Sequence, residues 1–336
     1  MHYDNYMKEC IELALQGAGN VSPNPLAGCV VLDKYGDKIS TGYHEKYGGN
    51  HAERNALLDC NAKDGTLIVN LEPCSHHGKT PPCTDLIIEK GIQRVVIGMR
   101  DPNPLVNGVQ KLTDAGIEVI EGVLEDECRK LNEVFIKNKT QGKTFAAIKT
   151  ASTLDGKIAT ACGSSKWITS EKARAEVKNI RKRYDAIMTT SATILADNPA
   201  MEHKTKIILD RRLKTDLNAR IYKQGKIYVF HEAVPPPSAA ENIEFIKISG
   251  LELVFGKLYE LGIMSVLIEA GGRFNGEALS YTDKIYHFIA PKVTGDNSAK
   301  SCFDYRKITD INESLNFKID KAEFFGPDLL MTIRRG

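Results

Sequence analysis

Short apolar runs alternate with amphipathic segments along the first 144 residues. Near the amino terminus, apolar side chains recur at helical spacing, at Tyr6, Cys10, Leu13 and Ala14. This spacing predicts a helix that ends at the glycines in positions 17 and 19. Two apolar runs then flank a turn at 33–37, which predicts a β-hairpin. Helical patterns at 51–60, 84–91 and 108–116 alternate with strand patterns at 66–72, 94–99 and 117–120. Such alternation is typical of an α/β domain with helices on both faces of a sheet.

A polar, lysine-rich connection at 136–144 interrupts the alternation, and a new apolar run starts at residue 144. We therefore predict two domains, 1–144 and 145–336, a division that also suits the length of the chain. In the second part, helical patterns at 170–183 and 251–262 alternate with strand patterns at 144–151, 185–190, 206–210, 226–230, 264–270 and 284–291. The prediction is an α/β protein of two three-layer domains.

Composition narrows the possible ligands. The 336 residues are 42% hydrophobic and 26% charged, and the formal net charge is only +2. The chain has no long run of like charges, which argues against nucleic acid as a partner. It also lacks an apolar run of about 18 residues, the length needed to span a membrane. The amino terminus is polar and acidic, unlike a signal peptide. We expect a cytoplasmic protein with a small-molecule ligand.

The eight cysteines divide into two groups. Disulfides are rare in the cytoplasm, so pairing is not expected. Cys10, Cys29, Cys60 and Cys128 lie within apolar patterns and are predicted to be small core residues. Cys74 and Cys83 differ, because polar and turn-forming residues surround them in the stretch NLEPCSHHGKTPPCTD. These two cysteines are candidates for chemistry.

One histidine and a glutamate complete a candidate metal site. His51 and Glu53 open a predicted helix, in the order His-x-Glu, and Cys74 follows a proline. One imidazole and two thiolates suit zinc, and three protein ligands leave a fourth position for water, whose pKa zinc lowers to about 7. Zinc deaminases that act on bases have this order of ligands, with a glutamate that moves protons without binding the metal. We therefore predict a catalytic zinc site of His51, Cys74 and Cys83, with Glu53 as the proton carrier.

Two alternatives remain open at this stage. His76 or His77 would close a structural Cys2His2 site if either served as the fourth ligand. A protein with such a site would be a zinc-stabilised interaction module without catalysis. Lys79, in the loop between the cysteines, is either a contact for a phosphate group or a solvated surface lysine.

Longer motifs carry a resemblance to a known family. SPNPLAGCVV, GYHEKYGGNHAERNAL, EPCSHHGKTPPCTDLI and MRDPNPLVNGVQKLTDAGIEV resemble the amino-terminal domain of the bifunctional riboflavin-biosynthesis deaminase and reductase. That domain belongs to the cytidine-deaminase-like superfamily. KTASTLDGKIAT, GSSKWITS, DAIMTTSATILADNP and LIEAGGRFNGEAL resemble the family's carboxy-terminal domain, whose fold is similar to dihydrofolate reductase. The eight-residue gap between the two cysteines also matches this family.

The resemblance implies that the first domain deaminates 2,5-diamino-6-ribosylamino-pyrimidinone 5'-phosphate. It implies the same zinc ligands and the same role for Glu53 as the residue pattern does. Further motif positions correspond to contacts with pyrimidine, ribose or phosphate: Asn24, His44, His76, Lys79, Asp101 and Asn103. A nucleic-acid base deaminase of the same superfamily is the nearest alternative, but it would need a basic face and stacking aromatic residues.

The resemblance also implies that the second domain reduces the ribosyl group of the product to ribityl with NADPH. Positions expected beside NADPH are Ala151, Trp167, Thr193, Asp197, Gly271, Gly272, Arg273, Phe274 and Asn275. The two glycines would let backbone amides approach phosphate without a side-chain clash. Positions expected at the substrate are Ser165, Arg181, Met201, Lys204 and Glu269, with Arg181 suited to bidentate phosphate binding.

The chain departs from the family at a few positions. Lys204 stands where many members have an arginine phosphate contact, and a point charge does not reproduce a planar guanidinium. Thr190 and Ala192 replace glycines, although both side chains remain small. The residues show no basic cluster that marks a site for the 2'-phosphate of NADPH, so the preference over NADH follows from the resemblance alone. A homo-oligomer, either dimer or tetramer, is expected as for many such enzymes.

Overall fold

The chain folds into two compact units, Met1–Gly142 and Lys143–Gly336. The structure is a computed structural model that describes residues 3–78, 80–236, 240–304 and 307–335. The junction between the units lies two residues before the boundary expected from the sequence. In the described residues, no helix combines the length and apolar character needed to cross a membrane.

The amino-terminal unit contains a five-stranded sheet in the order β2-β1-β3-β4-β5. Its strands are β1 (Gly28–Leu32), β2 (Lys38–Tyr43), β3 (Thr66–Leu71), β4 (Arg94–Met99) and β5 (Glu118–Glu121). β1 pairs antiparallel with β2 and β3, whereas β3, β4 and β5 run parallel. The predicted hairpin is therefore confirmed, and the parallel strands end at a common edge where loops meet.

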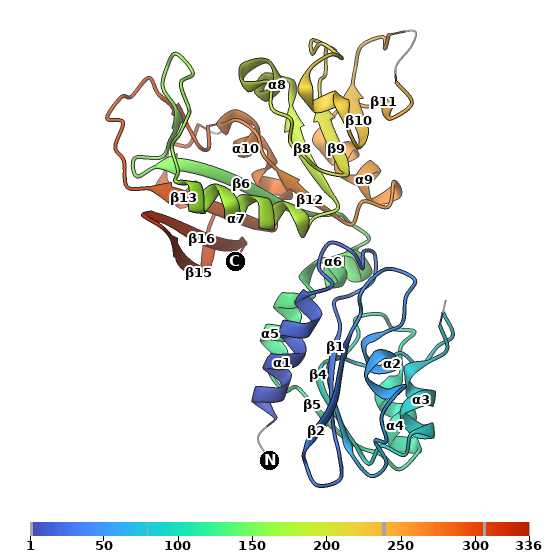
Figure 1. The fold of residues 1–336 in the computed structure, drawn as a ribbon. Coiled ribbons are helices and arrows are strands. Elements are labelled where there is room, and N and C mark those ends of the chain that lie inside the picture. Colours follow the sequence, from blue (N-terminus) through green and yellow to red (C-terminus); the bar gives the residue numbers. More distant parts are fainter. Residues whose placement is uncertain (1–2, 79, 237–239, 305–306, 336) are drawn as a thin grey trace. The chain divides into compact units, whose positions relative to one another are not determined.

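Helices cover both faces of this sheet, as Figure 1 shows. One face carries α2 (Ala52–Leu57), α3 (Cys83–Glu89) and α4 (Gly108–Asp114), and the other carries α1 (Asp4–Leu15) and α5 (Glu125–Leu131). Each face has its own apolar core, because β-strand side chains alternate between the two sides. Cys29 packs in the first core, with Cys60 partly buried against it, and Cys10 and Cys128 pack in the second. The three-layer prediction for this unit is confirmed.

The prediction of a polar connection at 136–144 is wrong for most of this segment. Helix α6 (Glu133–Gln141) occupies it and ends at Gly142, whose φ of 62° suits a helix terminus. Phe135 and Asn138 are buried on one side of this helix. The lysines of α6 lie at positions that are not buried, so the sequence of this segment is polar although it is helical. The helix before it, α5, has too short an apolar pattern to be predicted.

The carboxy-terminal unit contains a nine-stranded sheet in the order β11-β10-β9-β8-β12-β6-β13-β16-β15. Its strands are β6 (Phe145–Thr153), β8 (Ala186–Thr190), β9 (Thr205–Leu209), β10 (Lys226–His231), β11 (Ile243–Lys247), β12 (Ser265–Ile268), β13 (Lys284–Ala290), β15 (Phe317–Phe325) and β16 (Asp328–Arg335). The strands from β11 to β13 are parallel, and β16 and β15 continue the sheet antiparallel. β7 (Lys157–Ala159) and β14 (Lys300–Ser301) form a separate two-stranded sheet.

Helices pack against the large sheet and bury two apolar clusters. They are α7 (Glu171–Lys182), α8 (Ser191–Asp197), α9 (Leu251–Glu260) and α10 (Gly272–Ala278). The described residues of this unit also form three short 3-10 helices, η1 (Arg220–Lys223), η2 (Leu279–Tyr281) and η3 (Ile311–Glu313). At the N-cap of α7, the Ser170 hydroxyl accepts a hydrogen bond from the Ala173 amide, which fixes the start of that helix.

Candidate metal centre and ligand pocket

Three predicted metal ligands come together at the edge of the amino-terminal sheet. His51 is the N-cap residue of α2, Cys74 follows β3, and Cys83 is the first residue of α3. The His51 Nδ1 atom lies 3.5 Å from each of the two Sγ atoms. All three ligand atoms lie within 4.8 Å of one another, the separation expected around a single tetrahedral ion.

Hydrogen bonds already favour the ionised form of Cys74. A hydrogen bond from the Cys83 thiol lowers the pKa of Cys74 to about 4, against the opposing effect of burial. The Cys83 backbone amide also donates to the Cys74 sulfur at 3.3 Å. The bond with Cys74 raises the pKa of His51, and the pKa of Cys83 is raised by the same thiol contact and by burial. The three groups thus form a compact hydrogen-bonded cluster.

This donor set fits zinc and leaves one coordination position. The closed Cys2His2 alternative needs His76 or His77, but both side chains are exposed, and neither belongs to the ligand group found among the described residues. Zinc would be held by His51, Cys74 and Cys83. The three-ligand arrangement is the form found in catalytic zinc sites, whereas structural sites take four protein ligands.

Zinc added to chelator-treated protein is expected to stabilise the amino-terminal unit alone. At a zinc concentration of 100 Kd the gain should be about 2.7 kcal/mol, because the ion binds the folded form. Hydrogen exchange, measured during thermal unfolding, would report on the two units separately. His51→Asn should remove the gain. If zinc stabilised His51→Asn equally, or raised the unfolding temperature of the carboxy-terminal unit, the result would contradict the assigned ligands.

Glu53 lies in the first turn of α2, beside this cluster. Its side chain is buried, with the residue 4% exposed, and it contacts the Cys83 thiol. Burial, together with the negative charge of Cys74, raises the pKa of Glu53 to about 7. A carboxyl group with a pKa near neutrality both accepts and donates protons readily. A divalent cation on the three ligands would act in the opposite direction and favour the carboxylate.

Asn24 and His44 lie beside the candidate metal ligands, with His44 in contact with His51. The Asn24 amide nitrogen lies 3.1 Å from His44 Nε2, and His44 Nδ1 lies 2.8 Å from the Asn50 carbonyl oxygen. The Asn24 amide nitrogen can only donate and the Asn50 carbonyl oxygen can only accept, so this geometry fits a neutral imidazole with its proton on Nδ1. Burial lowers the pKa of His44, which agrees with this assignment. Its ring meets the His51 ring edge to face, with centroids 5.4 Å apart.

Asp101 and Asn103 lie in the loop that follows β4. Burial raises the pKa of Asp101, while the positive charges of Lys139 and His76 act against that rise. The Asn103 amide donates to the Asp101 carboxylate at 2.8 Å, so the two predicted residues form one short turn. His76 therefore lies close enough to Asp101 to affect its ionisation. Lys79 lies outside the described residues.

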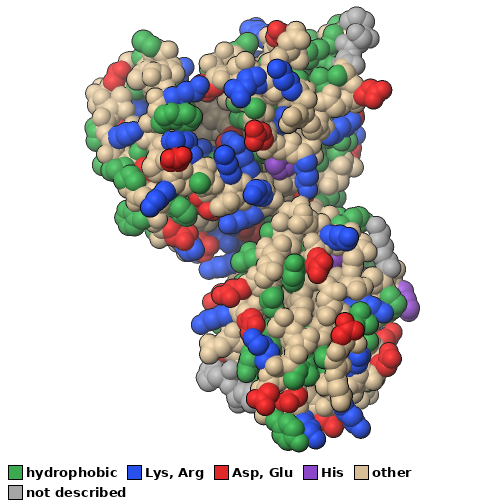
Figure 2. All heavy atoms as spheres, viewed as in Figure 1, with side chains coloured by type: hydrophobic (Ala, Val, Ile, Leu, Met, Phe, Trp, Pro, Cys, Tyr) green, Lys and Arg blue, Asp and Glu red, His purple; other side chains and the backbone are tan. Residues whose placement is uncertain are grey.

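The carboxy-terminal unit contains a cavity of about 1610 Å³ at the carboxyl ends of its parallel strands. Figure 2 shows its mouth as a hollow bordered by lysine and arginine side chains. Residues from β6, β8, β9, β10 and β12, or just after them, line it, which is the usual ligand position in open α/β sheets. The volume exceeds the 300–1,000 Å³ typical of a single small ligand and suits a dinucleotide with a second molecule.

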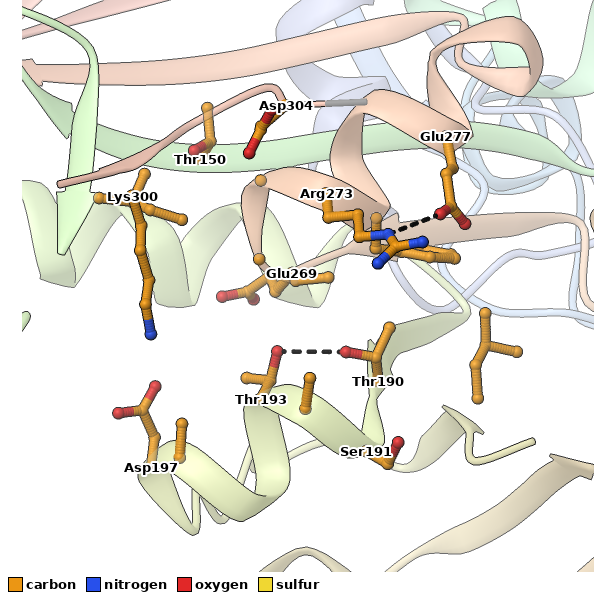
Figure 3. Close-up of a pocket in the computed structure, with 18 of the residues that line it drawn as sticks. Thr150, Thr190, Ser191, Thr193, Asp197, Glu269, Arg273, Glu277, Lys300 and Asp304 are labelled. Atoms are coloured by element: carbon orange, nitrogen blue, oxygen red, sulfur yellow. Dashed lines mark hydrogen bonds and ion pairs between the residues drawn. The ribbon is translucent and has the colours of Figure 1, made fainter. Parts of the chain in front are cut away.

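Most of the residues predicted at NADPH line this cavity: Ala151, Thr193, Asp197, Gly271, Gly272, Arg273 and Phe274. In Figure 3, Thr193 and Asp197 project from α8 into it, and the Asp197 side chain extends toward that of Lys300. Thr190 and Ala192, the two replacements of family glycines, also line the cavity. Two predicted positions lie elsewhere. Trp167 is mostly exposed and its ring packs on Arg174, while Asn275 is fully buried and donates to the Cys302 carbonyl oxygen.

The two glycines before and at the start of α10 have different roles. A Cβ atom on Gly272 would lie 1.8 Å from the Ser301 carbonyl oxygen, so a side chain cannot fit there. A Cβ atom on Gly271 would meet open space within the cavity. Gly272 is therefore required for packing against the strand β14, and only Gly271 leaves room for a ligand to approach the backbone.

Glu269 joins two cations at the centre of the cavity wall. It follows β12, and its residue is 8% exposed. Arg181 from α7 donates to both carboxylate oxygens, at 2.6 Å and 2.9 Å, and Lys149 Nζ lies 4.0 Å from one of them. Burial opposes ionisation, but the hydrogen bonds and charge of Arg181 and the charge of Lys149 lower the pKa of Glu269. Arg181 is thus bound to protein carboxylate in this structure.

Ser165 and Met201 line the cavity with Glu269, whereas Lys204 is exposed and is not among its lining residues. The sequence interpretation did not single out Lys149, although it lines the cavity and is partly buried. It also missed Arg211, Arg212 and Lys214, which line the cavity just after β9. The signal for those three was the segment DRRLK directly after a predicted strand.

These surroundings fit a phosphorylated dinucleotide. Basic side chains after β9 supply positive charge, and the backbone at Gly271 is open to the cavity. NADPH would be held by residues of α8, the Gly271 turn and the DRRLK segment. Apolar contacts from Ala151, Ile248 and Val254 would complete the lining.

Comparisons with known proteins match both parts of the chain. Residues 1–99 match the cytidine and deoxycytidylate deaminase zinc-binding region, and residues 144–331 match the RibD C-terminal domain. The riboflavin biosynthesis protein RibD of Actinobacillus pleuropneumoniae is 40% identical over 97% of this chain and 94% of its own. RibD of Escherichia coli is 34% identical over 98% of this chain and 99% of its own.

Solved structures agree with these matches along the whole chain. A diaminohydroxyphosphoribosylaminopyrimidine deaminase/5-amino-6-(5-phosphoribosylamino)uracil reductase from Thermotoga maritima is 41% identical, with a TM-score of 0.92. The alignment covers 100% of this chain and 99% of that one. RibD of Acinetobacter baumannii, 33% identical, has a TM-score of 0.89 at the same coverage.

Proposed function

The chain belongs to the RibD family, and from that premise we propose that its two sites act in succession on one phosphorylated pyrimidine. It is a bifunctional deaminase and reductase of riboflavin biosynthesis, with a zinc-binding deaminase domain and an NADPH-using reductase domain. The observation that carries the residue assignments is the convergence of His51, Cys74 and Cys83 beside a buried Glu53.

In the deaminase domain, water replaces a ring amine with a carbonyl and ammonia leaves. Zinc, when bound, supplies a Lewis acid that makes water a nucleophile at neutral pH. We assign the proton transfers to Glu53, whose carboxylate takes the two protons of the attacking water in turn and delivers one to the ring nitrogen and the other to the departing amine. Asn24 and neutral His44 present fixed polar groups for the pyrimidine, and Asp101 and Asn103 lie on the adjoining loop.

In the reductase domain, the protein aligns a sugar with the cofactor. NADPH, when bound, supplies the hydride that converts the ribosyl group to ribityl. We assign Thr193, Asp197 and the Gly271 turn to the cofactor, and Ser165, Met201 and Glu269 to the substrate. Since Arg181 is engaged with Glu269, we propose that it orients this carboxylate as well as contributing positive charge for the substrate phosphate.

Arg211 and Arg212 are proposed to bind the 2'-phosphate of NADPH. Replacing both by serine should raise the KM for NADPH by roughly tenfold to a hundredfold, the value of a lost charge-assisted hydrogen bond. The KM for NADH should change little, because NADH lacks that phosphate. Arg220→Ser, at an exposed position on η1, serves as the matched control. Equal losses with both cofactors would contradict the assignment.

The whole proposal is tested with the zinc-loaded protein and the diaminopyrimidine ribotide. Ammonia release and NADPH absorbance are followed separately. Without NADPH, ammonia alone should form, and with NADPH one cofactor should be consumed for each ammonia released. NADPH consumption without ammonia, or action on a nucleic-acid base in place of the ribotide, would overturn it.

We further propose that the enzyme works in the cytoplasm as a homo-oligomer, either a dimer or a tetramer. The cytoplasmic location is supported by the intermediates, which are charged phosphate esters, and the oligomer by the symmetry common among such enzymes. Sedimentation velocity at several concentrations of the full chain measures the oligomeric state. A monomer at all concentrations would contradict it.

A further inference from the structure

Glu72 is a buried carboxylate that the reaction scheme above does not use. It follows β3 and directly precedes Pro73 and Cys74, and it is 5% exposed. Its Oε2 atom accepts a hydrogen bond from the Asp101 amide at 3.1 Å, and its Oε1 atom accepts one from the Val109 amide at 2.9 Å. One side chain thus binds both ends of the segment 101–109.

Other contacts fasten the same two segments together. The Asn107 amide donates to the Ser75 hydroxyl at 2.8 Å. A Cβ atom on Gly108 would lie 2.1 Å from the Pro73 carbonyl oxygen, so the two backbones approach more closely than any side chain permits. The segment that carries Asp101 and Asn103 is therefore packed against the turn that carries Cys74.

We propose that Glu72 is a positioning residue of the deaminase site, which holds the 101–109 segment against the Pro73–Cys74 turn and so fixes Asp101 and Asn103 for the substrate. The inference rests on the proposed function for the role of that segment. Glu72 acts through the backbone amides of its neighbours and touches neither the metal ligand atoms of His51 nor those of the cysteines in the contacts described.

The chemistry of the contact requires a carboxylate. Both partners are N–H donors, and a carboxylate offers an acceptor oxygen to each. A glutamine of the same shape has one acceptor oxygen, and its NH2 group would face the second amide without forming a bond. Glu72 also lies beside Asp101, where its negative charge raises the pKa of that group. The two charge-assisted hydrogen bonds of Glu72 offset the unfavourable proximity of its negative charge to Asp101.

The test is Glu72→Gln in the full zinc-loaded chain, with the diaminopyrimidine ribotide as substrate. We expect one zinc per chain, a KM raised roughly tenfold to a hundredfold, and kcat within about threefold of the unsubstituted enzyme. Hydrogen exchange at the Asp101 and Val109 amides should become faster. Glu118→Gln, an exposed carboxylate on β5, is the matched control.

Different results separate the possible failures. Loss of zinc from Glu72→Gln would mean that the residue supports the metal turn, and an unchanged KM would mean that the segment is held without it; either overturns the inference. If that variant does not fold, Ser75→Ala must still raise KM at full zinc content, and no change refutes the inference. If the unsubstituted enzyme releases no ammonia, the proposed function has failed and the inference falls with it.

Discussion

Replacing Glu53 by glutamine is expected to abolish ammonia release and to leave reduction of the supplied deaminated product unchanged. Glutamine has the same shape but neither accepts nor donates a proton at neutral pH. Positioned proton transfer contributes about a hundredfold to ten-thousandfold to such reactions, and deamination needs several transfers. A loss of about a thousandfold or more in kcat is therefore expected, measured as ammonia formed under saturating ribotide.

Two controls make this result specific. Zinc content must remain at one per chain, since Glu53 is proposed to act beside the metal without binding it. Glu45→Gln, at an exposed position before the same helix, should behave like the unsubstituted enzyme. Parallel loss of both activities with the fold retained would contradict separate sites. Full deaminase activity in Glu53→Gln would instead contradict the assignment of the proton transfers to this residue.

The meeting of the three candidate metal ligands could be predicted, because metal binding depends on few residue types. His51, Cys74 and Cys83 come from three separate segments, yet each lies directly at a predicted helix start or strand end. Those junctions are the places where an α/β sheet gathers side chains. The exposure of His76 and His77, which argues against a fourth protein ligand, was harder to predict, because it depends on the path of a loop with several turn residues.

The basic segment after β9 shows why other features could not be predicted. Arg211 and Arg212 have an ordinary surface composition, and their place at the cavity follows from the parallel strand order, which sets β9 between β10 and β8. Lys149 is similar, since a lysine on a strand is usually exposed. The packing of β6 between β12 and β13 partly buries this side chain near Glu269.

Two elements with few buried side chains, α6 and the β15–β16 hairpin, were not predicted from the sequence. The segment that forms α6 is polar over most of its length, and only Phe135 and Asn138 are buried. A pattern with two buried positions is too weak to distinguish a short helix from a polar connection. The β15–β16 hairpin was missed for a comparable reason, because β15 is an edge strand and most of its side chains are exposed on both faces.

Glu269→Gln is expected to abolish reduction and to destabilise the carboxy-terminal unit, while deamination continues. The substitution removes the only carboxylate that pairs with Arg181 and Lys149 among the contacts described. Breaking a buried ion pair by removing one partner costs about 3–5 kcal/mol. The lower value applies here, because the Arg181 side chain is 24% exposed and is partly screened by water. Burial already lowers the pKa of Lys149, and its loss of a proton would limit the cost further.

The pH dependence of unfolding provides the check on this explanation. The folded-state pKa of Glu269 is lowered from 4.5, so the stability it contributes is complete above pH 4.5 and is lost as pH falls through the lower, folded-state value. The difference in unfolding free energy between the original enzyme and Glu269→Gln should therefore shrink below pH 4.5. Glu277→Gln, whose partner Arg273 is mostly exposed, should change stability by less than about 1 kcal/mol at any pH. A pH-independent difference for Glu269→Gln would show that lost packing, and not the buried charges, accounts for its effect.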